Sequence, residues 1–210
     1  VRAHLGLVQA EGLDEVSVWR LRQMAEEAPE EVRSALRPFG YYQPRINVRL
    51  EEPASDDDTW QATVRVQPGD PVTIAAVDIE LIGEGSNDPA LIDWRKEWPL
   101  KPRDVLEHAT YEAAWQTLDR LAERRGYFNA RFEERRVVVD PDRGSADVHI
   151  RFDTGQRYRF GSFSSENTDF SDRLMDRLTI IEDGEPYHSA RLDEQREALM
   201  LVGASGFAYE

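Results

Sequence analysis

The sequence predicts an α+β fold built as a tandem array of one repeating unit. Two landmarks return after 86 residues: Phe39-Gly40-Tyr41-Tyr42-Gln43 returns as Arg125-Gly126-Tyr127-Phe128-Asn129, and Pro68–Ile74 returns as Thr154–Phe160. A third Gly-aromatic pair, Gly206-Phe207, follows. One constant offset between separate landmarks indicates an array of a supersecondary unit, and such arrays usually bind partners.

The central unit reads as strand, helix, helix, strand, strand. Apolar residues alternate in two registers over Val72–Leu81, which predicts a strand with a shift near Ala75-Ala76. Ala90–Trp98 is a short helix candidate. A second helix is indicated by an apolar stripe spaced 4, 3 and 4 residues apart, at Tyr111, Trp115, Leu118 and Ala122. Gly126 follows that stripe as a helix-ending glycine, for which we expect a left-handed conformation.

Two strands complete this unit. Tyr127–Val139 reads as a strand, and Asp140–Gly144 has the composition of a hairpin turn. The last strand alternates apolar with polar residues, its apolar positions being Ala146, Val148, Ile150 and Phe152. We therefore expect a three-stranded mixed sheet with two helices on one face.

The repeat divides the chain into units at 1–68, 69–153 and 154–210, with boundaries near Gly69 and Gly155. The first lacks its opening strand, since Val1–Ala10 reads as a helix, and the third stops before its closing hairpin. The third is expected to contain a strand and two helices, at Tyr158–Phe163, Phe170–Ile180 and Ala190–Val202. We therefore expect a fragment of a longer protein.

The composition argues against several classes of function. A net charge of -15, from 41 acidic and 26 basic residues, disfavours binding to nucleic acid or an anionic membrane. The absence of cysteine excludes disulfides, thiolate metal sites and cysteine nucleophiles. No apolar run approaches the roughly 20 residues of a transmembrane helix.

No motif predicts an enzyme, a metal site or a cofactor site. The four histidines have no ligand-like spacing: His4, His108, His149 and His188. Asp140-x-Asp142-x-Gly144 lacks the rest of a calcium loop and reads as a hairpin turn, and Asp56–Asp58 reads as a solvated loop. Gly83-Glu84-Gly85 has no third glycine for a dinucleotide, and no serine lies in a nucleophile elbow.

The repeated landmarks resemble the POTRA domains of the BamA/TamA outer-membrane assembly family, and are closest to TamA. The resemblance is carried by Leu36–Pro44, Gly126–Asn129 and Gly155–Gly161, and it covers the whole chain. The residues of the motif are Gly40, Tyr41, Tyr42, Gly69, Gly126, Tyr127, Phe128 and Gly155. Within each aromatic pair, we expect at least one ring in the core.

The resemblance implies a periplasmic arm that continues into an outer-membrane β-barrel absent from this chain. It implies a role in inserting or secreting outer-membrane proteins such as autotransporters. The implied partners are unfolded outer-membrane protein clients and an inner-membrane-anchored TamB-like protein. Two alternatives stay open: the POTRA arm of a two-partner secretion transporter, against which the three units argue, and a structural spacer that binds no client.

A small sheet has edges that an extended polypeptide can join by β-augmentation, and the resemblance places the docking edge in the strand after the Gly-aromatic motif. That strand is Ile46–Leu50 in the first unit and Phe132–Val139 in the second. The partner-binding candidates are Arg45, Ile46, Asn47, Val48, Arg49 and Leu50. We expect Arg45, Asn47 and Arg49 to point outward, and pairing to begin only after Pro44, which has no N–H.

Overall fold

The computed structural model describes residues 5–9, 16–55, 59–162 and 177–206. It divides into two compact units, each made of three stretches of chain. Unit 1 comprises Val1–Asp78, Pro99–Glu112 and Val137–Val148, and unit 2 comprises Ile79–Trp98, Ala113–Arg136 and His149–Glu210. Among the described residues, no helix is both long and apolar enough to cross a membrane.

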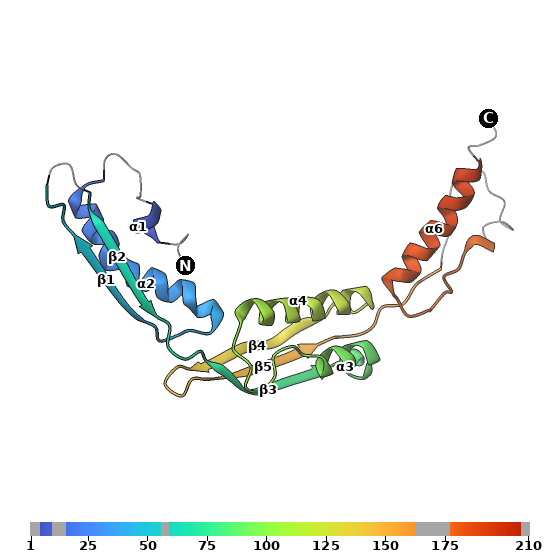
Figure 1. The fold of residues 1–210 in the computed structure, drawn as a ribbon. Helices are drawn as coiled ribbons and strands as arrows, with labels where there is room; N and C mark the ends of the chain where they lie inside the picture. Colours follow the sequence, from blue (N-terminus) through green and yellow to red (C-terminus); the bar gives the residue numbers. More distant parts are fainter. Residues whose placement is uncertain (1–4, 10–15, 56–58, 163–176, 207–210) are drawn as a thin grey trace. The chain divides into compact units, whose positions relative to one another are not determined.

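The amino-terminal part packs helices against a two-stranded sheet (Figure 1). Its helices are α1 (Gly6–Gln9) and α2 (Val18–Leu36), followed by the short 3-10 helix η2 (Arg37–Phe39), and its strands are β1 (Arg45–Glu51) and β2 (Gln61–Gln67). The Ser17 side chain caps α2 by accepting a hydrogen bond from the Arg20 N–H. Ala28, Val32 and Leu36 form the buried face of α2, against which the inward residues of both strands pack.

The central sheet has the order β3-β5-β4, from β3 (Thr73–Ile82), β4 (Arg131–Asp140) and β5 (Ser145–Asp153). It is mixed: the Thr73 N–H donates to the Gly144 carbonyl and the Thr154 N–H to the Ile82 carbonyl, so β3 runs parallel to β5. Between β3 and β4 the chain forms η3 (Glu84–Asn87), α3 (Pro89–Lys96) and α4 (His108–Arg124). The predicted α+β order is confirmed.

The two edge strands of this sheet each contain one residue more than the strand between them. β3 and β4 have 10 residues each and β5 has 9. In β3 the neighbours Ala75 and Ala76 are both exposed, which confirms the predicted shift of register. In β4 the neighbours Arg135 and Arg136 are both exposed. In both strands the alternation of exposed and less exposed residues therefore shifts by one position at these pairs.

Several element bounds differ from the sequence prediction. The short helix ends at Lys96 instead of Trp98. Tyr127–Ala130 forms a turn and the strand begins at Arg131, because the Tyr127 N–H bonds back to Ala122 and the Ala130 N–H bonds to Tyr127. In place of the predicted strand Tyr158–Phe163, the described part has a single bridge between Arg159 and Pro186.

The rest of the third repeat is described only in part. The last helix, α6 (Ser189–Gly206), corresponds to the predicted helix at Ala190–Val202. The predicted helix Phe170–Ile180 lies mostly outside the described residues, as do His4, Asp56–Asp58 and Phe207.

A buried carboxylate organises one end of unit 2. The Asp88 side chain, which is 2% exposed, caps α3 by accepting a hydrogen bond from the Ala90 N–H. It also accepts hydrogen bonds from Arg125 Nε at 2.7 Å and from the Tyr127 hydroxyl at 3.0 Å. Burial raises the pKa of Asp88, but these hydrogen bonds outweigh burial and hold it below its usual value.

Glycines with positive φ follow the helices of both repeats. Gly40 has φ 87 and Gly126 has φ 85, which confirms the expected conformation at Gly126. A Cβ at Gly126 would lie 2.7 Å from the Tyr187 Cβ, and a Cβ at Gly40 would lie 2.8 Å from Val105 Cγ1. At both positions, glycine is therefore favoured by the positive φ and by the lack of space for a side chain.

We predict that Gly126→Val lowers the free energy of unfolding by clearly more than Gly144→Val. Both glycines have positive φ, so each variant loses about 1–2 kcal/mol from the strained conformation. Only Gly126 adds a clash, because no atom lies within 4 Å of a Cβ built on Gly144. Urea unfolding followed by circular dichroism measures both, and equal losses would contradict the close packing at Gly126.

We also predict an alkaline loss of stability that depends on Tyr127. Burial, and then the hydrogen bond to Asp88, raise the pKa of Tyr127 to about 12. An unfolded tyrosine has a pKa of about 10, so the unfolded state loses this proton first. The free energy of unfolding should then fall between pH 10 and about 12. In Tyr127→Phe this fall should be smaller in urea titrations at several pH values, and an identical pH slope in both proteins would disprove the assignment.

Candidate functional site

The strand β1 has an open edge in the described part of its sheet. It pairs with β2 alone, in antiparallel register from Arg45 opposite Gln67 to Glu51 opposite Gln61. Its exposure alternates along the strand: Arg45, Asn47, Arg49 and Glu51 are exposed, and the three residues between them are half-buried. The six candidate residues therefore lie on one strand, and Arg45, Asn47 and Arg49 are exposed as expected. A neighbouring extended chain could pair with the open edge of that strand.

The second candidate strand, β4, also lies at the edge of its sheet. Its first half carries charged side chains that are already paired: Arg131 with Asp153 at 2.8 Å and Glu133 with Arg151 at 3.0 Å. The guanidinium of Arg135 stacks over the Trp115 ring at 3.8 Å. The exposure pattern of β4 shifts between Arg135 and Arg136, whereas that of β1 alternates without interruption.

Within unit 1, the first repeat meets the second through the backbone of Gly40. The Val72 N–H donates to the Gly40 carbonyl at 2.8 Å, and the Leu106 N–H donates to the Val72 carbonyl at 2.9 Å. Side chains add two contacts: the Tyr42 hydroxyl lies 2.7 Å from His108 Nε2, and Gln43 Nε2 donates to Asp142 Oδ1 at 2.8 Å. Burial raises the pKa of Tyr42.

Within unit 2, the second repeat meets the third by the same backbone bonds. The Tyr158 N–H donates to the Gly126 carbonyl at 2.8 Å, and the Tyr187 N–H donates to the Tyr158 carbonyl at 2.9 Å. Gly126 and Tyr158 are each 86 residues after Gly40 and Val72, so the junction repeats together with the sequence motif. Arg157 adds hydrogen bonds to the Arg125 and Tyr187 carbonyls.

The aromatic residues after these glycines divide between core and surface. Tyr127 is buried and Phe128 is 47% exposed, as expected for one ring of the pair in the core. Phe128 contacts the rings of Tyr158 and Tyr187, with centroids 5.3 and 4.8 Å away. In the first repeat, Tyr41 packs against the core of α2 and Tyr42 is half-buried at the junction.

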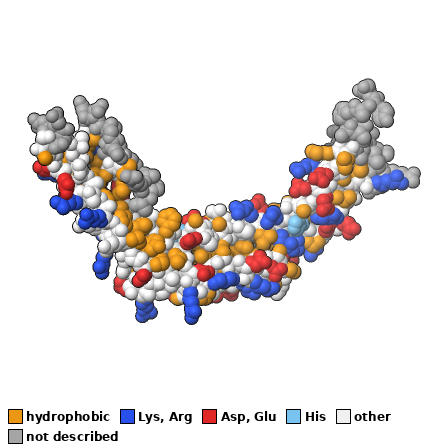
Figure 2. Space-filling view, in the orientation of Figure 1, with side chains coloured by type: hydrophobic (Ala, Val, Ile, Leu, Met, Phe, Trp, Pro, Cys, Tyr) orange, Lys and Arg blue, Asp and Glu red, His pale blue; other side chains and the backbone are white. Residues whose placement is uncertain are grey.

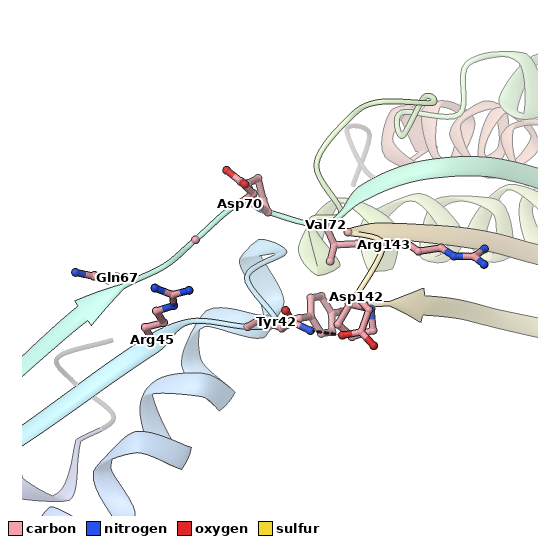
Figure 3. Close-up of a pocket in the computed structure, with 12 residues that line it drawn as sticks. Tyr42, Arg45, Gln67, Asp70, Val72, Asp142 and Arg143 are labelled. Atoms are coloured by element: carbon pink, nitrogen blue, oxygen red, sulfur yellow. Dashed lines mark hydrogen bonds between the residues drawn. The ribbon is translucent and has the colours of Figure 1, made fainter.

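A pocket of about 620 Å³ lies in unit 1 beside the first junction (Figure 3). Arg45 and Gln67, at the neighbouring ends of β1 and β2, form one side of it. The chain from Gly69 to Val72 and the β4–β5 hairpin from Pro141 to Gly144 form the rest, together with Tyr42. The lining is polar and contains both charges, so the pocket is suited to a polar segment of polypeptide rather than to an apolar ligand.

The described residues offer little for metal chemistry. No group of three or more His, Asp or Glu side chains in that part of the chain could hold a metal ion. Asp140, considered as part of a calcium loop, accepts hydrogen bonds from the N–H groups of Asp142 and Arg143 within the hairpin turn. On the face shown in Figure 2, acidic and basic side chains are interspersed between hydrophobic ones.

Sequence reasoning missed the side chains that tie the junctions together. No sequence motif singles out Asp88, and His108 has no ligand-like spacing. Their partners lie far away in sequence, Arg125 at 37 residues from Asp88 and Tyr42 at 66 residues from His108. The sequence signal that could have located the second junction is the 86-residue repeat. It makes Tyr158 the equivalent of Val72 and Gly126 the equivalent of Gly40.

Comparison with known proteins identifies two segments. Residues 1–68 match the family described as "POTRA domain TamA domain 1". Residues 93–155 match the POTRA family, described as "Surface antigen variable number repeat".

Solved structures give distant matches. The crystal structure of Haemophilus influenzae BamA POTRA3-5 is 16% identical, with a TM-score of 0.42, covering 92% of this chain and 83% of that one. POTRA1-3 of the periplasmic domain of Omp85 from Anabaena is 16% identical, with a TM-score of 0.33, covering 85% and 71%. The two family matches, which together span more than half of the sequence, carry the assignment: the chain belongs to the POTRA-domain family.

Proposed function

We propose that this chain is the periplasmic protein-interaction arm of an outer-membrane barrel protein. In this proposal it helps insert or secrete outer-membrane proteins such as autotransporters, and it binds partner or client chains by β-augmentation. The observation that carries the proposal is the open edge of β1 within a matched POTRA segment. Unfolded clients and an inner-membrane-anchored TamB-like protein are the proposed partners.

The chemistry of β1 supports strand addition. Backbone N–H and C=O groups at an unpaired edge bind another extended chain with little dependence on its sequence, which suits an arm that receives many clients. The exposed arginines Arg45 and Arg49 keep the edge soluble while it is free. We prefer β1 over β4 because the exposure of β1 alternates without interruption, whereas that of β4 shifts at Arg135 and Arg136.

We further propose that the functional units are 1–68, 69–153 and 154–210, so that each junction joins two units through a glycine carbonyl. An interaction role without enzymatic activity agrees with the POTRA matches and with the lack of any catalytic motif in the sequence. The POTRA arm of a two-partner secretion transporter and a spacer without client binding are the alternatives. A spacer differs in one observable, since it would not cross-link to a client through β1.

We predict that Asn47→Pro weakens partner binding while the second repeat stays folded. Proline removes one backbone donor from β1, and this should reduce photo-cross-linking from position 49 in cells that produce the full-length protein. Arg65→Pro is the matched control, because Arg65 is the pair partner of Asn47 on β2 and so has the same hydrogen-bonding role.

Two results separate the alternatives. If both proline variants fold, as judged by circular dichroism, and only Asn47→Pro loses cross-links, the β1 edge is the docking edge. Unchanged cross-linking in a folded Asn47→Pro protein would refute the edge model and would favour the helical face of α2. Absence of cross-links from position 49 in the wild-type protein would favour the spacer.

A further inference from the structure

The internal repeat allows the two junctions to be compared position by position. Adding 86 to each residue number of the first junction gives its equivalent at the second. Arg45 thus corresponds to Arg131, and Gln67 to Asp153. Both arginines begin the strand after the Gly-aromatic motif, and both partners lie at the end of the following strand.

At the second junction the arginine has a carboxylate. Arg131 Nη2 lies 2.8 Å from Asp153 Oδ2, and the Asp153 side chain is 16% exposed. Arg157 also belongs to this junction, where it donates to the Arg125 and Tyr187 carbonyls. This junction therefore supplies an internal carboxylate to Arg131.

At the first junction the same position lacks its carboxylate. Arg45 lies opposite Gln67, whose amide carries no charge. Among the described residues Arg45 has no ion pair and no side-chain hydrogen bond, and Pro71 stands where the second junction has Arg157. The pocket of about 620 Å³ lies at this place, with Arg45 and Gln67 in its lining.

The two carboxylates in the lining of the pocket, Asp70 and Asp142, form no ion pair with Arg45. Asp142 accepts a hydrogen bond from Gln43. Asp70 belongs to the lining, but no ion pair joins it to Arg45. Figure 3 shows these side chains around the open space. A ligand with a single negative charge fits better than a phosphate, because a dianion would be repelled by both aspartates.

We propose that Arg45 is a binding residue for the carboxylate of an acidic side chain on an extended polypeptide, held in this pocket. The inference rests on the proposed strand addition at β1. A strand that pairs with β1 reaches Arg45 at the end of the ladder, because Pro44 has no N–H with which to continue it. The partner chain then leaves the edge beside the pocket, and the acidic residue at that point takes the role that Asp153 has at the second junction.

The test measures binding of two labelled hexapeptides to the purified chain by fluorescence anisotropy. The first is N-acetyl-Val-Thr-Val-Thr-Val-Glu-amide, and the second has Gln in place of Glu. We expect the Glu peptide to bind about five- to tenfold more tightly, as for one charge-assisted hydrogen-bonded pair at a partly exposed site. Arg45→Gln should abolish this preference, whereas Asp70→Asn should strengthen binding of the Glu peptide by removing a like charge.

The sharpest variant is Gln67→Asp, which copies the second junction. It gives Arg45 an internal carboxylate and should remove the preference for the Glu peptide. Thr63→Asp is the matched control, because it adds the same charge to the same face of β2 but opposite Arg49, which already pairs with Glu51. The control should keep most of the preference, and thermal unfolding should show that both variants fold.

Three outcomes would overturn the proposal: equal affinity for the two peptides, no binding of either, or an undiminished preference in Gln67→Asp. A third peptide has Gln in place of Glu and a free carboxy terminus. If only this peptide binds tightly, Arg45 binds a terminal carboxylate, and the proposal that it binds an acidic side chain is overturned. None of these results would change cross-linking from position 49, so strand addition at β1 stands or fails separately.

Discussion

Each repeat is joined to the next through the carbonyl of a glycine that has left a helix with positive φ. The Gly40 and Gly126 carbonyls each accept a hydrogen bond, at 2.8 Å, from a backbone N–H of the next repeat, that of Val72 and that of Tyr158. A side chain at either glycine would overlap the segment that precedes the next helix. Each repeat is thus connected to the next by backbone atoms, at the glycine of the recurring Gly-aromatic motif.

With the backbone connection held constant, the side chains around it were free to differ. The second junction is filled by a buried carboxylate, two arginines and a tyrosine, centred on Asp88. The first has two side-chain contacts, from Tyr42 to His108 and from Gln43 to Asp142, and a polar pocket containing Arg45. A buried ion pair needs its partners in place to offset desolvation, so the second junction is suited to holding structure. In the described part of the chain, the first has an arginine without an ion pair, Arg45, at the end of a strand with an open edge, which suits it to binding.

Sequence alone predicted the features that depend on local periodicity. The stripe from Tyr111 to Ala122 and the alternation from Ala146 to Phe152 gave α4 and β5, because one face of each is buried. The predicted start of β4 was wrong. The aromatic side chains of Tyr127 and Phe128 favour a strand locally, but hydrogen bonds from Tyr127 to Ala122 and to Asp88 hold this segment in a turn. The contact with Asp88 spans 39 residues and leaves no local pattern.

The candidate site divides in the same way. The outward alternation of Arg45, Asn47 and Arg49 could be predicted, because a strand has a period of two. The pocket could not, because it is formed by chain segments as far apart as Tyr42 and Gly144. The difference between Gln67 and Asp153 was visible in the sequence, but its meaning depends on knowing that each lies beside an arginine.

Hydrogen–deuterium exchange on the full-length protein, with and without its partner, tests the central claim most directly. If the arm binds extended chains along β1, the amides of Arg45–Glu51 should exchange more slowly when the partner is present, because outward N–H groups gain acceptors. The amides of α6 should not change. Protection confined to α2, with β1 unaffected, would contradict the account.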